Sequence, residues 1–237
     1  MIMGITKVNL NEQVAQIIKS KIVSLEFRPG DRLIVEPLAK EINVSMTPVR
    51  EGLRNLVFEG LVTYDGKSYS VFNPTKKDVL DISLIRSTLE NLAFQLAAVA
   101  MTDEEIDEME KQYVDKCKNT RNQSIDEFIE ADMLIHNTVR RCADNPRLRD
   151  ILRPLQEQDW LIRRWIFVTN YSQDIIDKTF NEHMALIAAL RLHDSKKTSH
   201  AIEKHMATSK NITLQGLDIF WDEKQEDSKI SQSMHTH

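Results

Sequence analysis

The chain has 237 residues, of which 41% are hydrophobic and 28% charged, a composition that suits a soluble globular protein with a real core. Only six glycines and six prolines occur, which favours a mainly helical protein. The net charge of −5 excludes a global basic field, but the first 75 residues carry nine Lys/Arg against eight Asp/Glu. Such a nearly neutral part can still bind DNA if its cations share one face.

Signals for export, membranes or disulfides are sparse. The two cysteines, Cys117 and Cys142, match no zinc or redox spacing, which indicates a reducing compartment. The N-terminus lacks a cationic region followed by an apolar core, and no apolar run approaches 18 residues. We therefore expect no signal peptide, no membrane partner and a cytoplasmic location.

The first third of the sequence begins with two predicted helices. Apolar residues at spacings of three and four predict a helix over residues 10–25, ended by the turn signal at residues 28–31. Residues 32–35 can form a short extended piece. Pro37 suits the start of a second short helix, and Asn43 tolerates the left-handed conformation that a tight turn needs.

The stretch from Val44 to Val62 organises this part of the chain, because it predicts a short helix with two faces. Ser45 or Thr47 can cap its start, and Gly60 can close it with a left-handed exit. Its apolar face carries Val49, Leu53, Leu56 and Val57, and its polar face carries Thr47, Arg50, Glu51 and Arg54. A helix with outward cations and hydroxyls suits a DNA major groove, and an ordinary surface helix is the alternative.

Two short strands follow this helix. Residues 61–64 and 69–72 flank Asp65-Gly66, the dipeptide typical of a hairpin turn. Two helices, a recognition helix and a hairpin together predict a winged helix-turn-helix.

Several motifs in this region resemble the DNA-binding domain of the GntR family of bacterial transcription regulators. They are Pro29-Gly30-Asp31-Arg32-Leu33, Leu38-Ala39, Val44-Ser45-Met46-Thr47-Pro48-Val49-Arg50-Glu51 and Glu59-Gly60-Leu61-Val62. In that family, hydroxyls and arginines of the recognition helix contact DNA and the wing glycine approaches the minor groove. The resemblance therefore implies DNA contacts by Ser45, Thr47, Arg50 and Gly66.

Three further positions qualify this resemblance. Arg54, one turn beyond Arg50, is expected to be a phosphate contact or plain surface. Met46 stands where the family usually has arginine, and Tyr69 stands where a wing glycine is common. One DNA contact is therefore missing or replaced, and the wing departs from the family pattern.

The remaining two thirds predict an all-helical domain. Residues 1–73 form the predicted winged domain, 74–77 a linker, 78–222 the helical domain and 223–237 a polar tail. Six helices joined by short connections imply an antiparallel bundle. They are expected over residues 78–101, 103–118, 124–142, 146–170, 172–193 and 196–220, with the first burying Val79, Ile82, Ile85, Leu89, Leu92, Leu96 and Ala97. The expected fold is thus mainly α, a winged helix-turn-helix followed by a bundle of about six helices.

One acidic residue and three histidines can meet inside this bundle. Asp132 and His136 are four residues apart on one helix face. His183 and His205 each lie eleven residues from Asp194 in a helical hairpin, at the same height, roughly 16 Å from the turn. This set suits a divalent transition metal such as zinc, nickel or manganese, and the alternative is four separate packed or surface residues.

The same pattern resembles the ligand-binding domain of FadR-type GntR regulators, the FCD type, over about residues 77–220. Many members hold a metal with one Asp and three His, and a small organic acid completes the coordination. The resemblance implies that Asp132, His136, His183 and His205 bind the metal, zinc first. That class also commonly has an arginine and a glutamate on the first bundle helix, and Arg86 and Glu90 fit this pattern. The resemblance implies that Arg86 binds the effector carboxylate, or else pairs with Glu90.

These features predict a ligand-responsive transcription regulator. It would bind a pseudo-palindromic double-stranded operator as a homodimer and respond to a small carboxylate effector at the metal site. In one alternative the metal itself is the signal. In the other the site belongs to a metal-dependent hydrolase, but no motif around a separate catalytic base accompanies it.

Overall fold

The computed structural model describes residues 10–118, 124–170 and 172–234, with residues 168–170 and 222–234 described by their backbone alone. Two compact units divide between Pro74 and Thr75. We call them the winged unit (Met1–Pro74) and the helical unit (Thr75–His237). Among the described residues, no helix combines the length and apolarity needed to cross a lipid bilayer.

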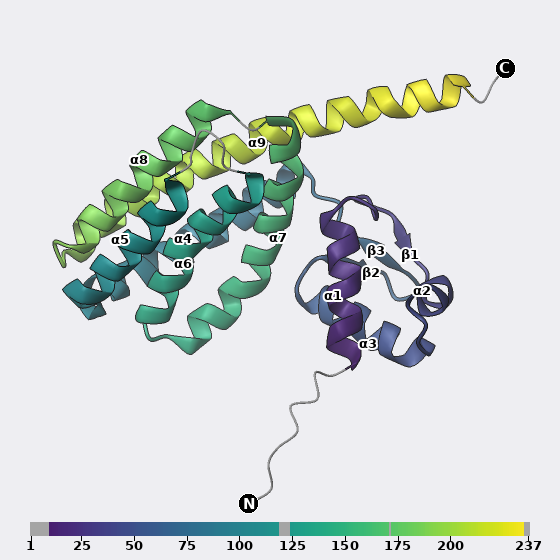
Figure 1. The fold of residues 1–237 in the computed structure, drawn as a ribbon, viewed down its shortest axis with the longest axis horizontal. Helices are drawn as coiled ribbons and strands as arrows, with labels where there is room; N and C mark the ends of the chain where they lie inside the picture. Colours follow the sequence, from purple (N-terminus) through teal and green to yellow (C-terminus); the bar gives the residue numbers. More distant parts are fainter. Residues whose placement is uncertain (1–9, 119–123, 171, 235–237) are drawn as a thin grey trace, which may run out of the picture. The chain divides into compact units, whose positions relative to one another are not determined.

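The winged unit has the predicted order of elements (Figure 1). They are α1 (Leu10–Val23), β1 (Arg32–Leu33), α2 (Val35–Ile42), α3 (Met46–Phe58), β2 (Val62–Tyr64) and β3 (Tyr69–Val71). The strands form an antiparallel sheet in the order β1-β3-β2, in which Thr63 pairs with Ser70. The predicted winged helix-turn-helix is therefore confirmed.

The turns of the winged unit follow from single residues. Asn43 ends α2 in the left-handed conformation (φ 59°), and its amide donates back into the helix, so the chain reverses directly into α3. Helices α1 and α3 pack closely, because a Cβ on Gly52 would lie 3.1 Å from the backbone of Asn11 and Ala15. This packing fixes the face that α3 leaves exposed.

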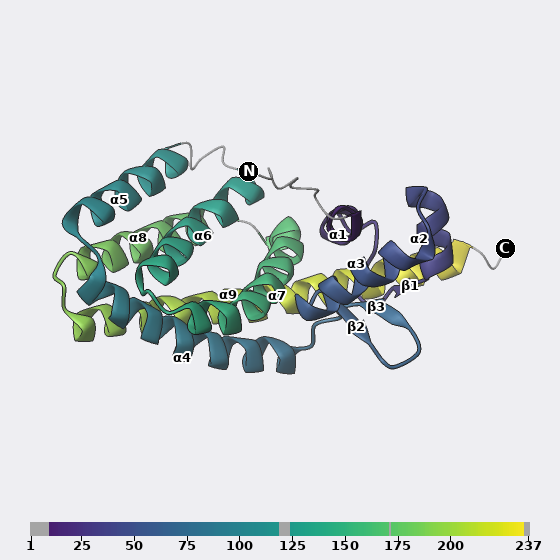
Figure 2. The same cartoon turned by 90° about the horizontal axis from the view of Figure 1, so that it is seen from below.

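The helical unit contains six helices among the described residues, as predicted (Figures 1 and 2). They are α4 (Lys76–Ala100), α5 (Asp103–Cys117), α6 (Ile125–Cys142), α7 (Pro146–Asn170), α8 (Gln173–Leu190) and α9 (Ser195–Met234). Helix α4 packs most extensively against α9. The core between the helices includes Phe94, Ile135, Leu152, Leu186 and Ile202.

Both ends of the helical unit differ from prediction. Helix α4 begins at Lys76, because Thr75 and Asp78 form a capping box, so Lys76 and Lys77 of the expected 74–77 linker belong to this helix. Helix α9 continues to Met234 instead of ending near Phe220. The expected polar tail contains no glycine or proline that would stop a helix. Residues 235–237 lie outside the described part of the chain.

The buried face of α4 was predicted only in part. Val79, Ile82 and Ala97 are buried as expected, but Ile85, Leu92 and Leu96 are exposed. Two charged residues, Arg86 and Glu90, lie inside instead. The prediction was wrong because it assumed an apolar interior, whereas these charges have buried partners of opposite sign.

Candidate DNA-binding surface and metal centre

The predicted DNA contacts lie on the exposed side of α3 and in the wing. Ser45 is the N-cap of α3 and makes no side-chain capping hydrogen bond, and Thr47 and Arg50 are exposed on the first turns. Pro48 and Val49 point into the core. The start of α3 therefore presents hydroxyls and a cation to solvent, as a recognition helix does.

The remaining predicted positions of this surface are also exposed. Arg54 Nη1 lies 2.7 Å from Glu51 Oε1, so its charge is already paired on the helix surface. Met46 is 45% exposed at the first position of α3. Gly66 stands at the hairpin tip with φ 92° and nothing near its Cβ position, which leaves room for close approach to a partner.

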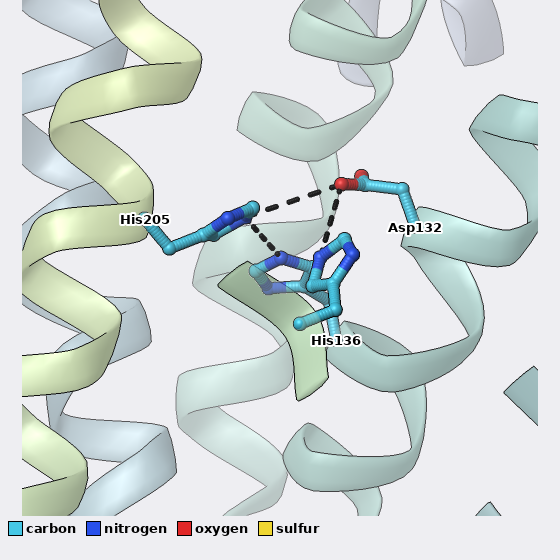
Figure 3. A group of neighbouring side chains, drawn as sticks. Asp132, His136 and His205 are labelled. Carbon is cyan, nitrogen blue, oxygen red and sulfur yellow. Dashed lines mark hydrogen bonds and ion pairs between the residues drawn. The ribbon is translucent and has the colours of Figure 1, made fainter. Parts of the chain in front are cut away.

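The four predicted metal ligands meet in the helical unit. Asp132 and His136 come from α6, His183 from α8 and His205 from α9, and all four are buried. One potential ligand atom from each lies within 4.8 Å of the others. Figure 3 shows three of them, Asp132, His136 and His205, pointing toward one another. The predicted equal height of His183 and His205 is confirmed, since their ring centroids are 4.5 Å apart.

The same nitrogen of each imidazole faces the centre. His136 Nε2 lies 3.2 Å from His205 Nε2, and His183 Nε2 lies 3.3 Å from Asp132 Oδ1. His183 Nε2 is fully buried without a hydrogen-bond partner among the described residues. Three imidazole nitrogens and one carboxylate oxygen around one buried point form a donor set that could hold a divalent transition metal.

Each of these four side chains also contacts a second group on its far side. His136 Nδ1 lies 3.4 Å from Glu90 Oε2, and His183 Nδ1 lies 3.0 Å from the Tyr113 hydroxyl. The other two partners are Arg163 Nη1, 2.5 Å from Asp132 Oδ2, and Glu182 Oε2, 3.4 Å from His205 Nδ1. Such partners orient metal-binding side chains and set the histidine tautomer.

The surroundings of Asp132, His136 and His183 favour the protonation states that bind metal. Burial lowers the pKa of His183 to about 4, and burial also lowers the pKa of His136. Burial opposes ionisation of Asp132, but the Arg163 charge outweighs it and holds the pKa of this carboxyl well below its usual range. The imidazoles of His136 and His183 are therefore neutral, and the carboxyl of Asp132 is ionised, at neutral pH.

Buried ion pairs link α4, α6 and α7 beside the ligands. Arg86 Nη1 lies 2.6 Å from Asp159 Oδ2, and Arg163 Nη1 lies 4.0 Å from the same oxygen. Glu90 pairs with Arg140 and lies 3.9 Å from Arg86. Burial raises the pKa of Glu90, but the Arg140 charge and His136 outweigh it and lower the pKa to about 2. Residues of alternating charge thus connect Asp132 to His136 around one side of the site, in the order Arg163, Asp159, Arg86 and Glu90.

Sequence patterns predicted that the four candidate ligands would meet, but they missed most of the residues that contact them. Asp159, Arg163 and Arg140 stand within polar stretches of α7 and α6 that read as solvated helix faces. Glu182 directly precedes a ligand histidine, and Tyr113 has no motif around it. Arg86 was predicted, and in the structure both of the expected roles remain compatible with its position, although its close contact is with Asp159.

Comparison with known proteins agrees with this two-part organisation. Residues 10–68 match the model of bacterial regulatory proteins of the gntR family, and residues 81–208 match the FCD domain model. The chain is 29% identical over 212 residues to the uncharacterized HTH-type transcriptional regulator YdhC of Bacillus subtilis, covering 88% of this chain and 91% of that protein.

Two relatives from Escherichia coli extend the comparison. The transcriptional repressor GlaR is 26% identical over 209 residues, covering 84% of this chain and 94% of GlaR. The solved structure of McbR/YncC shares the fold, with a TM-score of 0.70 at 21% identity over 94% of this chain and all of that one. These relatives are named as regulators or repressors, which places the chain outside the enzymes and overrides the hydrolase alternative. The chain is a member of the GntR family of bacterial transcription regulators, with an FCD domain following its helix-turn-helix.

Proposed function

We propose that the protein binds a pseudo-palindromic operator as a homodimer and responds to a small organic acid bound at a metal ion. The observation that carries this proposal is the convergence of Asp132 and three histidine Nε2 atoms on one buried point. Zinc suits the three-nitrogen, one-oxygen donor set best, with nickel or manganese as alternatives.

Arg86 is the proposed partner of the effector carboxylate. Its Nε is buried without a hydrogen-bond partner among the described residues, while Nη1 contacts Asp159. The cavity that Arg86 lines with Asp132 and His136 has a volume of ≈10 Å³, room for about one water. An organic acid needs more space, so its carboxylate would take the place of Asp159 on Arg86.

This exchange gives the effector a means of moving α7. Asp159 also faces Arg163, which holds the ligand Asp132. Asp159→Asn would remove the charge that competes with the acid, so the acid response would occur at lower concentration. Arg86→Lys would lose the bidentate contact and weaken the response without abolishing metal binding.

The outer face of α4 supports the homodimer. Leu84 and Val99 are 68% and 73% exposed, and Leu80, Leu92 and Leu96 are exposed on the same side of the helix. Helix α4 runs along one side of the bundle (Figure 2). A helix at the surface of a monomer usually exposes its charged face and buries its apolar face. Helix α4 does the opposite, because its outer face is leucine-rich and its inner face is charged.

A second copy of the chain is the proposed occupant of this face. Beyond Asp81, the exposed side of α4 carries no charged residue up to Ala100, so a charged partner would find no complement. A two-fold interface must be self-complementary, and apolar side chains against apolar side chains meet that requirement. A groove of ≈560 Å³ between α4 and α9, lined in part by Leu80 and Leu84, would accommodate side chains of the second copy.

Two substitutions test the interface against a matched control. Leu84→Asp with Val99→Asp is expected to give a monomer of unchanged helix content, measured by sedimentation and circular dichroism. Ile151→Asp places the same charge on α7, at a residue that is 56% exposed, and should remain dimeric. A dimeric double variant would contradict the assignment of this face, and a monomeric parent would contradict the homodimer itself.

Operator titration tests the response. Fluorescence anisotropy on an operator obtained by in vitro selection would be measured with zinc alone and with zinc plus small mono-, di- and tricarboxylic acids. A shift with an acid supports the effector proposal, whereas a shift with metal alone supports the metal-responsive alternative, which the small cavities at the site favour. If neither changes operator affinity, the sensing proposal fails and DNA binding stands.

A further inference from the structure

Helix α5 supplies no metal ligand, yet it contacts one of the ligands directly. Tyr113 on α5 places its hydroxyl 3.0 Å from His183 Nδ1, and both side chains are buried. The other two ligand histidines face carboxylates, Glu90 and Glu182, at the equivalent nitrogen. His183 is therefore the one ligand histidine of this site whose outer partner is a neutral hydroxyl.

The direction of this hydrogen bond follows from the site. When Nε2 of His183 binds a metal, Nδ1 carries the proton and donates to the Tyr113 oxygen. The phenol must then donate its own proton elsewhere. Cys117, one helical turn further along α5, lines the same small cavity as Tyr113 and His183, and its sulfur can accept that proton.

The surrounding packing holds the Tyr113 ring in place. It is 2% exposed, stacks on Phe180 with ring centroids 5.7 Å apart, and meets the His183 ring edge-on at 5.2 Å. The cavity beside Tyr113, Cys117 and His183 measures ≈10 Å³, too small for the ring to swing away.

We propose that Tyr113 is a positioning residue of the metal centre, whose hydroxyl, anchored by Cys117, fixes His183 with Nε2 turned toward Asp132. This inference rests on the proposed metal site. Helix α5 supplies no metal ligand, yet it becomes part of that site, because the tautomer of His183 depends on Tyr113 and Cys117 of this helix.

Tyr113→Phe tests the inference, because it removes the hydroxyl and keeps the ring contacts with Phe180. We expect zinc affinity, measured by competition with a chromogenic chelator, to fall roughly 10–100-fold. The ligand-field absorption of the cobalt-loaded protein should change, while the thermal unfolding of the chelator-treated protein moves little. Tyr69→Phe in the winged unit makes the same chemical change away from the metal and should match the parent in all three measurements.

A pair of substitutions at Cys117 tests the anchor. Cys117→Ser keeps an acceptor for the phenol proton and should bind zinc nearly as the parent does. Cys117→Ala removes that acceptor and should weaken zinc binding by an intermediate factor. Equal zinc affinity and an equal cobalt spectrum for Tyr113→Phe and the parent would overturn the role of Tyr113. A parent that binds neither metal would overturn the metal site itself.

Discussion

Metal removal is expected to destabilise the helical unit and to leave the winged unit unchanged. The ligands Asp132, His136, His183 and His205 come from three helices, α6, α8 and α9, so a metal binds only when these helices are packed. A ligand that binds only the native state stabilises it by about 4 kcal/mol at a thousand times its Kd. The winged unit contains none of these residues and provides an internal control.

The size of the effect follows from the size of the unit. For a domain of 150–250 residues, 1 kcal/mol changes the unfolding temperature by about 2–4 °C. Zinc in large excess over its Kd should therefore raise the transition of the helical unit by roughly 8–16 °C. Differential scanning calorimetry of chelator-treated and zinc-loaded protein would measure both transitions, and spectroscopic probes in each unit would assign them.

Substitution of the ligands separates metal binding from general salt effects. Replacing His183 and His205 by glutamine removes two of the four ligands and should abolish the zinc-induced rise. An equal rise in that double variant would refute the assignment of the site. A rise in both transitions of the parent would also refute it, because binding at this site stabilises only the unit that contains it.

Four further predictions concern charged side chains other than the candidate ligands. Arg140→Met leaves Glu90 buried and unpaired and should cost about 3–5 kcal/mol of unfolding free energy in urea, whereas replacing both by apolar residues should cost much less. The pKa of Glu90 is lowered from 4.5 to about 2, so this residue should contribute about 3 kcal/mol to the free energy of unfolding above pH 5. That contribution should be lost as the pH falls toward 2. In the Glu90→Gln variant, the free energy of unfolding should change less over the same pH range. Hydrogen bonds to Asp103 and to a backbone carbonyl raise the pKa of His193. Protonated His193 should therefore stabilise the folded protein below pH 6.5, and this contribution should be lost as the pH rises through the raised pKa. The His193→Gln variant should show no such loss when its free energy of unfolding in urea is measured at pH 6 and pH 8. Met46→Arg should strengthen operator binding and steepen its salt dependence, and unchanged affinity in anisotropy titrations would contradict the placement of Met46 against DNA.

The winged unit was predictable because single residues determine its turns. Asn43, Gly60 and Gly66 all adopt the positive φ angles that their residue types indicated. Between these turns, the spacing of the apolar residues predicted whether each segment forms a helix or a strand. The meeting of Asp132, His136, His183 and His205 was predictable for a similar reason, since helical periodicity and equal distances from a turn fix which side chains share one level of a bundle.

The interior of α4 and the outer partners of the ligands were not predictable by the same means. Periodicity assigns charged residues to the surface, and it placed Leu92 and Leu96 inside where Arg86 and Glu90 are found. Burial of those charges depends on opposite charges from α6 and α7, which are distant in sequence. A hydrogen bond such as that between Tyr113 and His183 likewise exists only once α5 and α8 are packed together.

The capping box at the start of α4 has a mechanical consequence. The helix contains no glycine or proline between Lys76 and Ala100, and Thr75 clamps its first turn directly after the winged unit ends at Pro74. Glu90, beside the metal ligands, lies about 22 Å along the axis from Thr75 at 1.5 Å per residue. Because α4 has no glycine or proline hinge over this length, a rotation of the helix imposed at Glu90 would be carried to its first turn, next to the end of the winged unit.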